Sequence, residues 1–221
     1  MCLIGMKVKV MKTLSEMSLT ELWQLFPILL TEHQECWQLW YEEEKNALLK
    51  LLPQASVTRI SHIGSTAVVN IWAKPIIDIL VETSTSTYMD EIESRLCQNG
   101  WLCMNRSENR RSFNKGYTEQ GFAEKVYHLH LRQSGDNREL YFRDYLRVHP
   151  NVARDYEQLK LDLWKKFEHD RDGYTEAKSE FVERYTERAV QLYAGRYGGA
   201  AIDKNDNCPS TKNKFSPHDS V

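Results

Sequence analysis

The chain has 221 residues, of which 41% are hydrophobic and 27% charged, with 29 Lys and Arg against 31 Asp and Glu. This balance excludes an intrinsically disordered protein and gives enough apolar surface to close a core. The net charge of -2 argues against a protein that coats nucleic acid, while it allows a local basic pocket for a small anion.

Five cysteines are scattered along the chain, at positions 2, 36, 97, 103 and 208. They form no C-x-x-C pair and no zinc-binding spacing with histidine, so we expect reduced thiols and a cytoplasmic protein. The longest apolar run, residues 25–30, contains a proline and is far shorter than the roughly 20 residues of a membrane helix. The sequence therefore predicts no membrane partner.

The first part of the chain predicts two helices and two strands. Ser18 and Glu21 form a capping-box pattern that opens a short helix ending near Pro27, and a longer amphipathic helix is expected over residues 33–52. A β-prone run then starts at Val57 and breaks at a turn of small residues. Residues 76–81 are almost entirely apolar, which predicts a central strand, interrupted by Asp78.

The second part predicts a helix over 88–99, three strands and three helices. The strands, over 101–105, 110–117 and 126–133, are expected to be antiparallel neighbours in one sheet. Helices then follow to about residue 197, with Asn151 as the N-cap of the second and with the third starting near Tyr174. From Gly195 onward the sequence loses periodicity, and we expect the tail to be disordered.

The most specific segment is a Gly-Ser turn before the strand at 76–81. Gly64 has no Cβ, so backbone amides and the hydroxyls of Ser65 and Thr66 can approach phosphate oxygens. In nucleotidyl transfer such a turn lies beside a strand whose carboxylates hold divalent metal against a triphosphate. Asp78 is correctly spaced to supply one carboxylate, although it can also be a buried structural acid bonded to loop amides.

A later strand supplies imidazoles instead of a further carboxylate. In residues 126–132 the period of two places His128, His130 and Arg132 on one face. If that face meets Asp78, the site suits a phosphate, or a zinc or manganese ion, better than two Mg²⁺ ions. The histidines can also be solvated residues on an exposed sheet face, or metal ligands of a hydrolase.

Four segments of the chain resemble the GrpB family, a bacterial group assigned to the nucleotidyltransferase superfamily. They are HIGSTAVVNIWAKPIIDILVE (62–82), YHLHLR (127–132), LYFRDYLRVHPNVARDYEQLK (140–160) and DGYTEAKSEFVERYTERA (172–189). The resemblance covers about residues 13–192. It implies a mixed α/β sheet of nucleotidyltransferase-like fold with a helical C-terminal part, in a family whose domain is also found fused to dephospho-CoA kinase.

On this basis we expect an α/β core with N-terminal helices over residues 13–135. C-terminal helices packed on that core are expected over 136–197, and a disordered tail over 198–221.

One part of the superfamily pattern is missing from the chain. The catalytic strand of that superfamily carries two acids two residues apart, and the positions at this spacing from Asp78 are Ile76 and Leu80. Glu82 shares the face of Asp78, but their Cα atoms should be about 13 Å apart, too far to share one ion. The sequence thus predicts an incomplete two-metal site.

The resemblance also singles out Arg143, Lys160, Tyr174 and Lys178, and implies that they contact a nucleotide. The cations would neutralise phosphates, and the ring of Tyr174 would stack on a base. Lys74, directly before a proline, is either a solvated loop residue or a further point charge for phosphate.

The leading hypothesis is transfer of a nucleotidyl group from a nucleoside triphosphate to a small acceptor. The triphosphate would bind at Gly64 and Ser65, with Asp78, His130 and Ser65 as catalytic residues. Asp78 and His130 are also the candidate ligands of a divalent cofactor, Mg, Mn or Zn. The alternative is a binding protein for a nucleotide or phosphate ligand that has lost the two-metal site. The acceptor, the base preference and the oligomeric state are left open.

Overall fold

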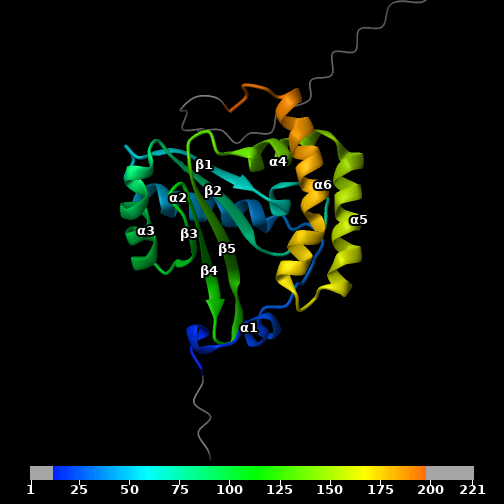
Figure 1. The fold of residues 1–221 in the computed structure, drawn as a ribbon, viewed down its shortest axis with the longest axis horizontal. Helices are drawn as coiled ribbons and strands as arrows, with labels where there is room; N and C mark the ends of the chain where they lie inside the picture. The colour runs from blue at the N-terminus through cyan, green and yellow to red at the C-terminus, as the bar shows by residue number, and fades with distance from the viewer. Residues whose placement is uncertain (1–11, 198–221) are drawn as a thin grey trace, which may run out of the picture.

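A computed structural model describes residues 12–197 as a five-stranded sheet with helices packed on it (Figure 1). The strands are β1 (Val57–Ile63), β2 (Ile77–Thr83), β3 (Leu102–Arg106), β4 (Arg110–Thr118) and β5 (Gly121–Gln133). The α-helices are α1 (Leu19–Leu25), α2 (Cys36–Leu51), α3 (Met89–Gln98), α4 (Arg138–Val148), α5 (Pro150–Lys166) and α6 (Arg171–Leu192). Short 3-10 turns are η1 (Leu14–Glu16), η2 (Ser65–Ala67) and η3 (Ser86–Tyr88). This is the mixed α/β architecture that the sequence predicts.

The sheet has the order β1-β2-β5-β4-β3, and β2 and β5 are its parallel pair. After β2 the chain passes through α3 to the far edge and returns by β3 and β4, each antiparallel to the next. The predicted antiparallel run of three strands is therefore confirmed. The parallel pairing sets Asp78 of β2 directly opposite His128 of β5.

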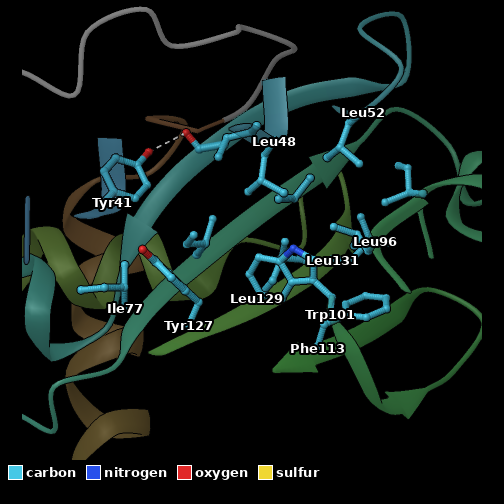
Figure 2. Close-up of a cluster of buried hydrophobic side chains, with 14 of the residues drawn as sticks. Tyr41, Leu48, Leu52, Ile77, Leu96, Trp101, Phe113, Tyr127, Leu129 and Leu131 are labelled. Atoms are coloured by element: carbon cyan, nitrogen blue, oxygen red, sulfur yellow. Dashed lines mark hydrogen bonds between the residues drawn. The ribbon is translucent and has the colours of Figure 1, made fainter. Parts of the chain in front are cut away.

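One face of the sheet is covered by α2 and α3 and forms the main apolar core (Figure 2). Alternate residues of β5, Tyr127, Leu129 and Leu131, point into it. From α2, Tyr41 packs against the same core and donates a hydrogen bond to the carbonyl of Ile60 at 3.1 Å. The predicted alternation of β5 is thus confirmed, because its other residues face away from this core.

The opposite face of the sheet lies toward the C-terminal helices. In Figure 1, α5 and α6 run side by side beside the sheet, and α4 crosses above it. A second apolar cluster joins Val68 and Ile71, after the Gly-Ser turn, to Leu146 of α4 and Tyr156 of α5. A third joins β1 and β2 to Leu140 of α4. These two clusters hold the helices against the sheet but leave part of its face uncovered.

The predicted element boundaries are mostly confirmed at the N-terminal end and differ later in the chain. Ser18 caps α1 with the predicted capping box. Asn151 is not a cap, because α5 starts at Pro150, whose fixed φ suits the first turn of a helix. The last helix starts before Tyr174, because the side chain of Asp170 accepts from the amide of Gly173 at 2.8 Å.

Two remaining expectations concern cysteines and membranes. Cys36, Cys97 and Cys103 are free thiols, whereas positions 2 and 208 and the expected disordered tail at 198–221 lie outside the described residues. Within residues 12–197, none of the helices has the length and apolar character to cross a bilayer.

Candidate functional site

A cavity of about 430 Å³ lies between the sheet and the C-terminal helices. The polar residues of the sequence-based prediction that line it are Gly64, Ser65, Thr66, Lys74, Asp78, His128, His130, Lys160, Tyr174 and Lys178. They come from the turn after β1, from the segment that leads into β2, from β2 and β5, and from α5 and α6. The fold thus brings together residues that are up to 114 positions apart in the chain, from 64 to 178.

Asp78 points into the cavity from β2, and the Gly-Ser turn lies against it. A Cβ placed on Gly64 would lie 2.3 Å from Oδ2 of Asp78, so only glycine fits there. The backbone of Gly64 agrees, with φ 72 and ψ -172, a conformation that is open essentially to glycine alone. The predicted closeness of this turn to Asp78 is therefore present in the structure.

His128 forms a chain of polar contacts between Tyr117 and Asp78. Its Nδ1 lies 3.3 Å from Oδ1 of Asp78, and its Nε2 lies 2.7 Å from the hydroxyl of Tyr117. Burial lowers the pKa of His128 against the opposing hydrogen bond with Asp78, so the ring is neutral. A neutral ring facing a carboxylate carries its proton on Nδ1, which leaves Nε2 to accept from Tyr117.

His130 is held in a similar way from the other side. Its Nδ1 lies 3.3 Å from the guanidinium of Arg132, which can only donate, so Nδ1 is the acceptor. Its Nε2 then carries the proton and lies 3.7 Å from Oδ1 of Asp78. Asp78, His128 and His130 together are called the carboxylate wall. In this wall both imidazoles direct an N–H at the same carboxylate oxygen, His128 within hydrogen-bond distance and His130 at a longer 3.7 Å.

These donors keep Asp78 ionised. Burial is the largest single cause and would raise its pKa, but the hydrogen-bonding and electrostatic interactions with His128 and His130 together outweigh burial and hold the pKa of Asp78 far below its usual range. Both donors are directed at Oδ1. The other oxygen, Oδ2, accepts no hydrogen bond within the part of the chain that the structure describes, and the side chain is 27% exposed. Asp78 therefore offers an open acceptor to the cavity.

Three lysines also line the cavity, and we call Lys74, Lys160 and Lys178 the lysine wall. Burial is the main cause that lowers their pKa values, to about 7 for Lys74 and Lys160 and about 8 for Lys178. Repulsion from Lys178 lowers the pKa of the other two further. Of the carboxylates that line the cavity, Glu183 pairs with Arg138 at 2.6 Å and Glu139 lies 3.7 Å from Arg132, which leaves Asp78 to balance the three lysines.

Tyr174 stands between two of these cations. The Nζ atoms of Lys178 and Lys74 lie 4.3 Å and 5.0 Å from the centre of its ring, which is fully buried. Its hydroxyl has no hydrogen-bond partner among residues 12–197. A buried hydroxyl without a partner is unusual in a folded protein and indicates a place that a ligand can occupy.

A family model described as GrpB protein matches residues 27–188. The chain belongs to the GrpB family. It is 35% identical to the Glutamate-rich protein GrpB of Alkalihalophilus pseudofirmus, over 71% of this chain and 92% of that protein. It is 33% identical to the UPF0157 protein YqkA of Bacillus subtilis over 74% of this chain and 48% of that protein, so it spans about half the length of YqkA. The crystal structure of conserved protein GrpB from Enterococcus faecalis matches with a TM-score of 0.66 at 31% identity, over 75% of this chain and 99% of that one.

Not every site residue that the sequence predicts lines the cavity. Arg143 is buried and donates to the carbonyl of His62 at 2.8 Å and to Asp144 at 2.9 Å, so it fastens α4 to the end of β1. Arg132 lies behind His130 rather than in the cavity. Lys160 lines the cavity but also donates to the carbonyl of Trp72. Arg143 and Arg132 therefore contact residues that surround the cavity and do not line it themselves.

Two tyrosines of this GrpB site were not predicted from the sequence. Tyr117 contacts His128, and Tyr156 lines the cavity beside Ser65. Burial raises the pKa of Tyr156 to about 12, with a smaller opposing effect from a hydrogen bond with Ser65. Tyr156 lies in a segment that carries the family resemblance, so the sequence could have indicated its place in the site. Nothing in the sequence indicates Tyr117, because a bulge at Gly116 decides which way its side chain points.

The metal that the superfamily implies does not fit this arrangement. Among the described residues, no group of three or more His, Cys, Asp or Glu side chains is placed to hold an ion. With the tautomers that Tyr117 and Arg132 favour, the nitrogens of His128 and His130 that face Asp78 carry protons and offer no lone pair to a metal. Leu80, at one of the positions where a second acid would stand, is fully buried and packs with Ile63. The predicted metal role of Asp78 and His130 has no support in this geometry.

Proposed function

We propose that this GrpB-family chain binds a small phosphate-bearing molecule in the cavity. The observation that carries the proposal is the lysine wall: three lysine side chains line one cavity together with the hydroxyl of Tyr174, which has no partner among residues 12–197. Buried cations are costly unless an anion balances them, and phosphate oxygens accept from ammonium and phenol groups alike. The resemblance to the nucleotidyltransferase superfamily makes a nucleotide the first ligand class to test.

The size and shape of the cavity support the proposal. A volume of about 430 Å³ falls within the roughly 300–1,000 Å³ of small-molecule sites. The lining combines apolar side chains such as Leu30, Phe142 and Val182 with charged side chains from the sheet and from α4, α5 and α6. Such a lining suits a ligand of limited size with one anionic end.

A thermal-shift panel tests this function. Inorganic phosphate and nucleoside mono-, di- and triphosphates are each added with and without Mg²⁺, Mn²⁺ or Zn²⁺. A ligand at 100 times its dissociation constant should stabilise the protein by about 2.7 kcal/mol. Lys178→Met should remove the shift, and Lys165→Met, an exposed lysine on α5, should retain it. A flat panel with the unaltered chain would rule the function out.

Nucleotidyl transfer is the second candidate, and the Gly64 turn against Asp78 favours it. In this reaction an acceptor oxygen bonds to the α-phosphorus of a nucleoside triphosphate, and the bond to the bridging oxygen breaks to release pyrophosphate. The proton of the acceptor hydroxyl passes to Oδ2 of Asp78. Release of pyrophosphate that Asp78→Asn abolishes would support transfer, whereas binding without release would leave the first function alone.

A further inference from the structure

The two walls of the cavity have opposite chemistry, which restricts how a ligand can lie. The carboxylate wall presents Oδ2 of an ionised Asp78, because both imidazoles face Oδ1, His128 at 3.3 Å and His130 at 3.7 Å. An unpaired carboxylate oxygen repels phosphate and accepts from hydroxyl groups. The phosphate and Asp78 must therefore contact different parts of the ligand.

The lysine wall supplies the place for the phosphate. Lys74 and Lys178 lie on Tyr174 at 5.0 Å and 4.3 Å from the ring centre, and the Tyr174 hydroxyl is buried without a partner among the described residues. Arg138 and Glu183, which also line the cavity, pair with each other at 2.6 Å, and Glu139 lies 3.7 Å from Arg132. The three lysines, once a bound anion holds them protonated, therefore exceed the charge of Asp78 by about two. A phosphate monoester carries up to two negative charges, so it matches this excess better than a diester or a carboxylate does.

We infer that the natural ligand is a phosphate monoester of a polyol, with its phosphate on the lysine wall and a hydroxyl donating to Oδ2 of Asp78. This inference rests on the proposed function and adds the substrate class and its orientation. In this orientation the phosphate lies away from Asp78, whereas nucleotidyl transfer would require the reacting phosphate to lie beside Asp78. An ammonium group in place of the hydroxyl is disfavoured, because Lys74 and Lys178 are close enough to Asp78 to interact with it electrostatically.

Calorimetric titration of the full chain with matched phosphate esters tests the inference. Ribitol 5-phosphate and n-pentyl phosphate have the same carbon chain and phosphate but differ in hydroxyl groups. A hydrogen bond to a charged group should give ribitol 5-phosphate at least about a tenfold tighter binding. Asp78→Asn should abolish this difference, and should leave pentyl phosphate bound as tightly or more tightly because a repulsive charge is gone.

The outcomes separate this inference from the proposed function. Equal binding of the two esters to the unaltered chain overturns the hydroxyl contact while phosphate binding stands. Retention of the difference in Asp78→Asn overturns it as well. Tighter binding of 5-aminopentyl phosphate than of ribitol 5-phosphate assigns Asp78 an ammonium partner instead. If neither ester nor inorganic phosphate binds, the proposed function fails first. The comparison in the unaltered chain does not depend on how any variant folds.

Discussion

The two faces of the sheet use the same strands for opposite purposes. On the face toward α2 and α3, Ile79 and Leu129 are fully buried in one apolar core. On the other face, Asp78 and His128 lie side by side and open into a cavity. Neighbouring residues of one strand therefore alternate between a position in the apolar core and a candidate binding position.

Histidines show most clearly that the face decides the role. His62 lies on the core face, stacks on Tyr41 with ring centres 4.7 Å apart, and contacts Thr66 at 3.0 Å. Burial is the main cause that lowers its pKa to about 3, so it stays neutral. His128 is also neutral, but it directs its proton at Asp78 in the cavity. The same residue type is a packing group on one face and a donor to the candidate site on the other.

Substitutions of two adjacent residues of β5 test most directly whether one face of the sheet serves stability and the other serves binding. Leu129→Ala should lower the free energy of unfolding by about 2–5 kcal/mol, because it leaves a void in a fully buried core. His130→Ala should cost about 1 kcal/mol or less, because that side chain is 27% exposed. Urea denaturation measures both. A smaller cost for Leu129→Ala than for His130→Ala would contradict the division, and only His130→Ala should weaken binding of phosphate esters.

The sequence predicted this division well where the signal was local. Alternation in residues 126–132 placed His128 and His130 opposite the apolar residues, and the Gly-Ser turn was placed beside Asp78. The small-residue turn and the period of two are properties of neighbouring residues, so they can be read without the fold.

The prediction failed where long-range packing decides the role of a charge. Arg143 resembled a phosphate ligand, yet it binds the carbonyl of His62, 81 positions earlier in the chain. Tyr117 enters the site only because β4 bulges at Gly116. The mutual repulsion of Lys160 and Lys178 likewise depends on how α5 packs on α6. None of these contacts has a period or motif that marks it.

The lysine wall should lower the stability of the protein when no ligand is bound, whereas the apolar core on the other face of the sheet raises it. Lys160→Met should raise the free energy of unfolding at pH 7 by about 1–4 kcal/mol, because it removes a buried cation. Burial lowers the pKa of Lys160 in the folded protein to about 7, below its unfolded value of 10.5. The unfolded chain therefore binds more protons between these pH values, and the stability of the unaltered chain rises with pH across that window.

The gain from Lys160→Met should accordingly be largest at pH 7 and should close as the pH approaches about 10. Urea denaturation across this range measures it, with the exposed Lys165→Met as the matched control on α5. A constant gain at every pH, or a loss of stability at pH 7, would show that Lys160 is not a strained cation. Inorganic phosphate should reduce the stability difference between Lys160→Met and the unaltered chain at pH 7, because it should stabilise only the unaltered chain.

The contact of the Gly-Ser turn with Asp78 joins β1 to the cavity face and is tested by Gly64→Ala. The added Cβ would lie 2.3 Å from Oδ2 of Asp78, and alanine resists the backbone conformation of Gly64. We expect a loss of about 1–3 kcal/mol in unfolding free energy together with weaker binding of phosphate esters. Gly135→Ala is the control, because its φ is also positive but its Cβ meets nothing within 4 Å. Unchanged ligand binding in Gly64→Ala would separate this turn from the site.

The smallest expected effect concerns Tyr117, which acts on the cavity only through His128. Tyr117→Phe removes the hydroxyl 2.7 Å from Nε2 of His128 and should cost about 1 kcal/mol or less of stability. In the unaltered protein the imidazole ¹⁵N chemical shifts of His128 should report a proton on Nδ1, because Asp78 accepts it and Tyr117 donates to Nε2. In the variant Nε2 loses its donor, so the second tautomer should gain population and the hydrogen bond to Asp78 should weaken. A proton on Nε2 of His128 in the unaltered protein would contradict this arrangement. His128 would then not donate to Asp78, and Oδ1 would be as open an acceptor on the cavity face as Oδ2.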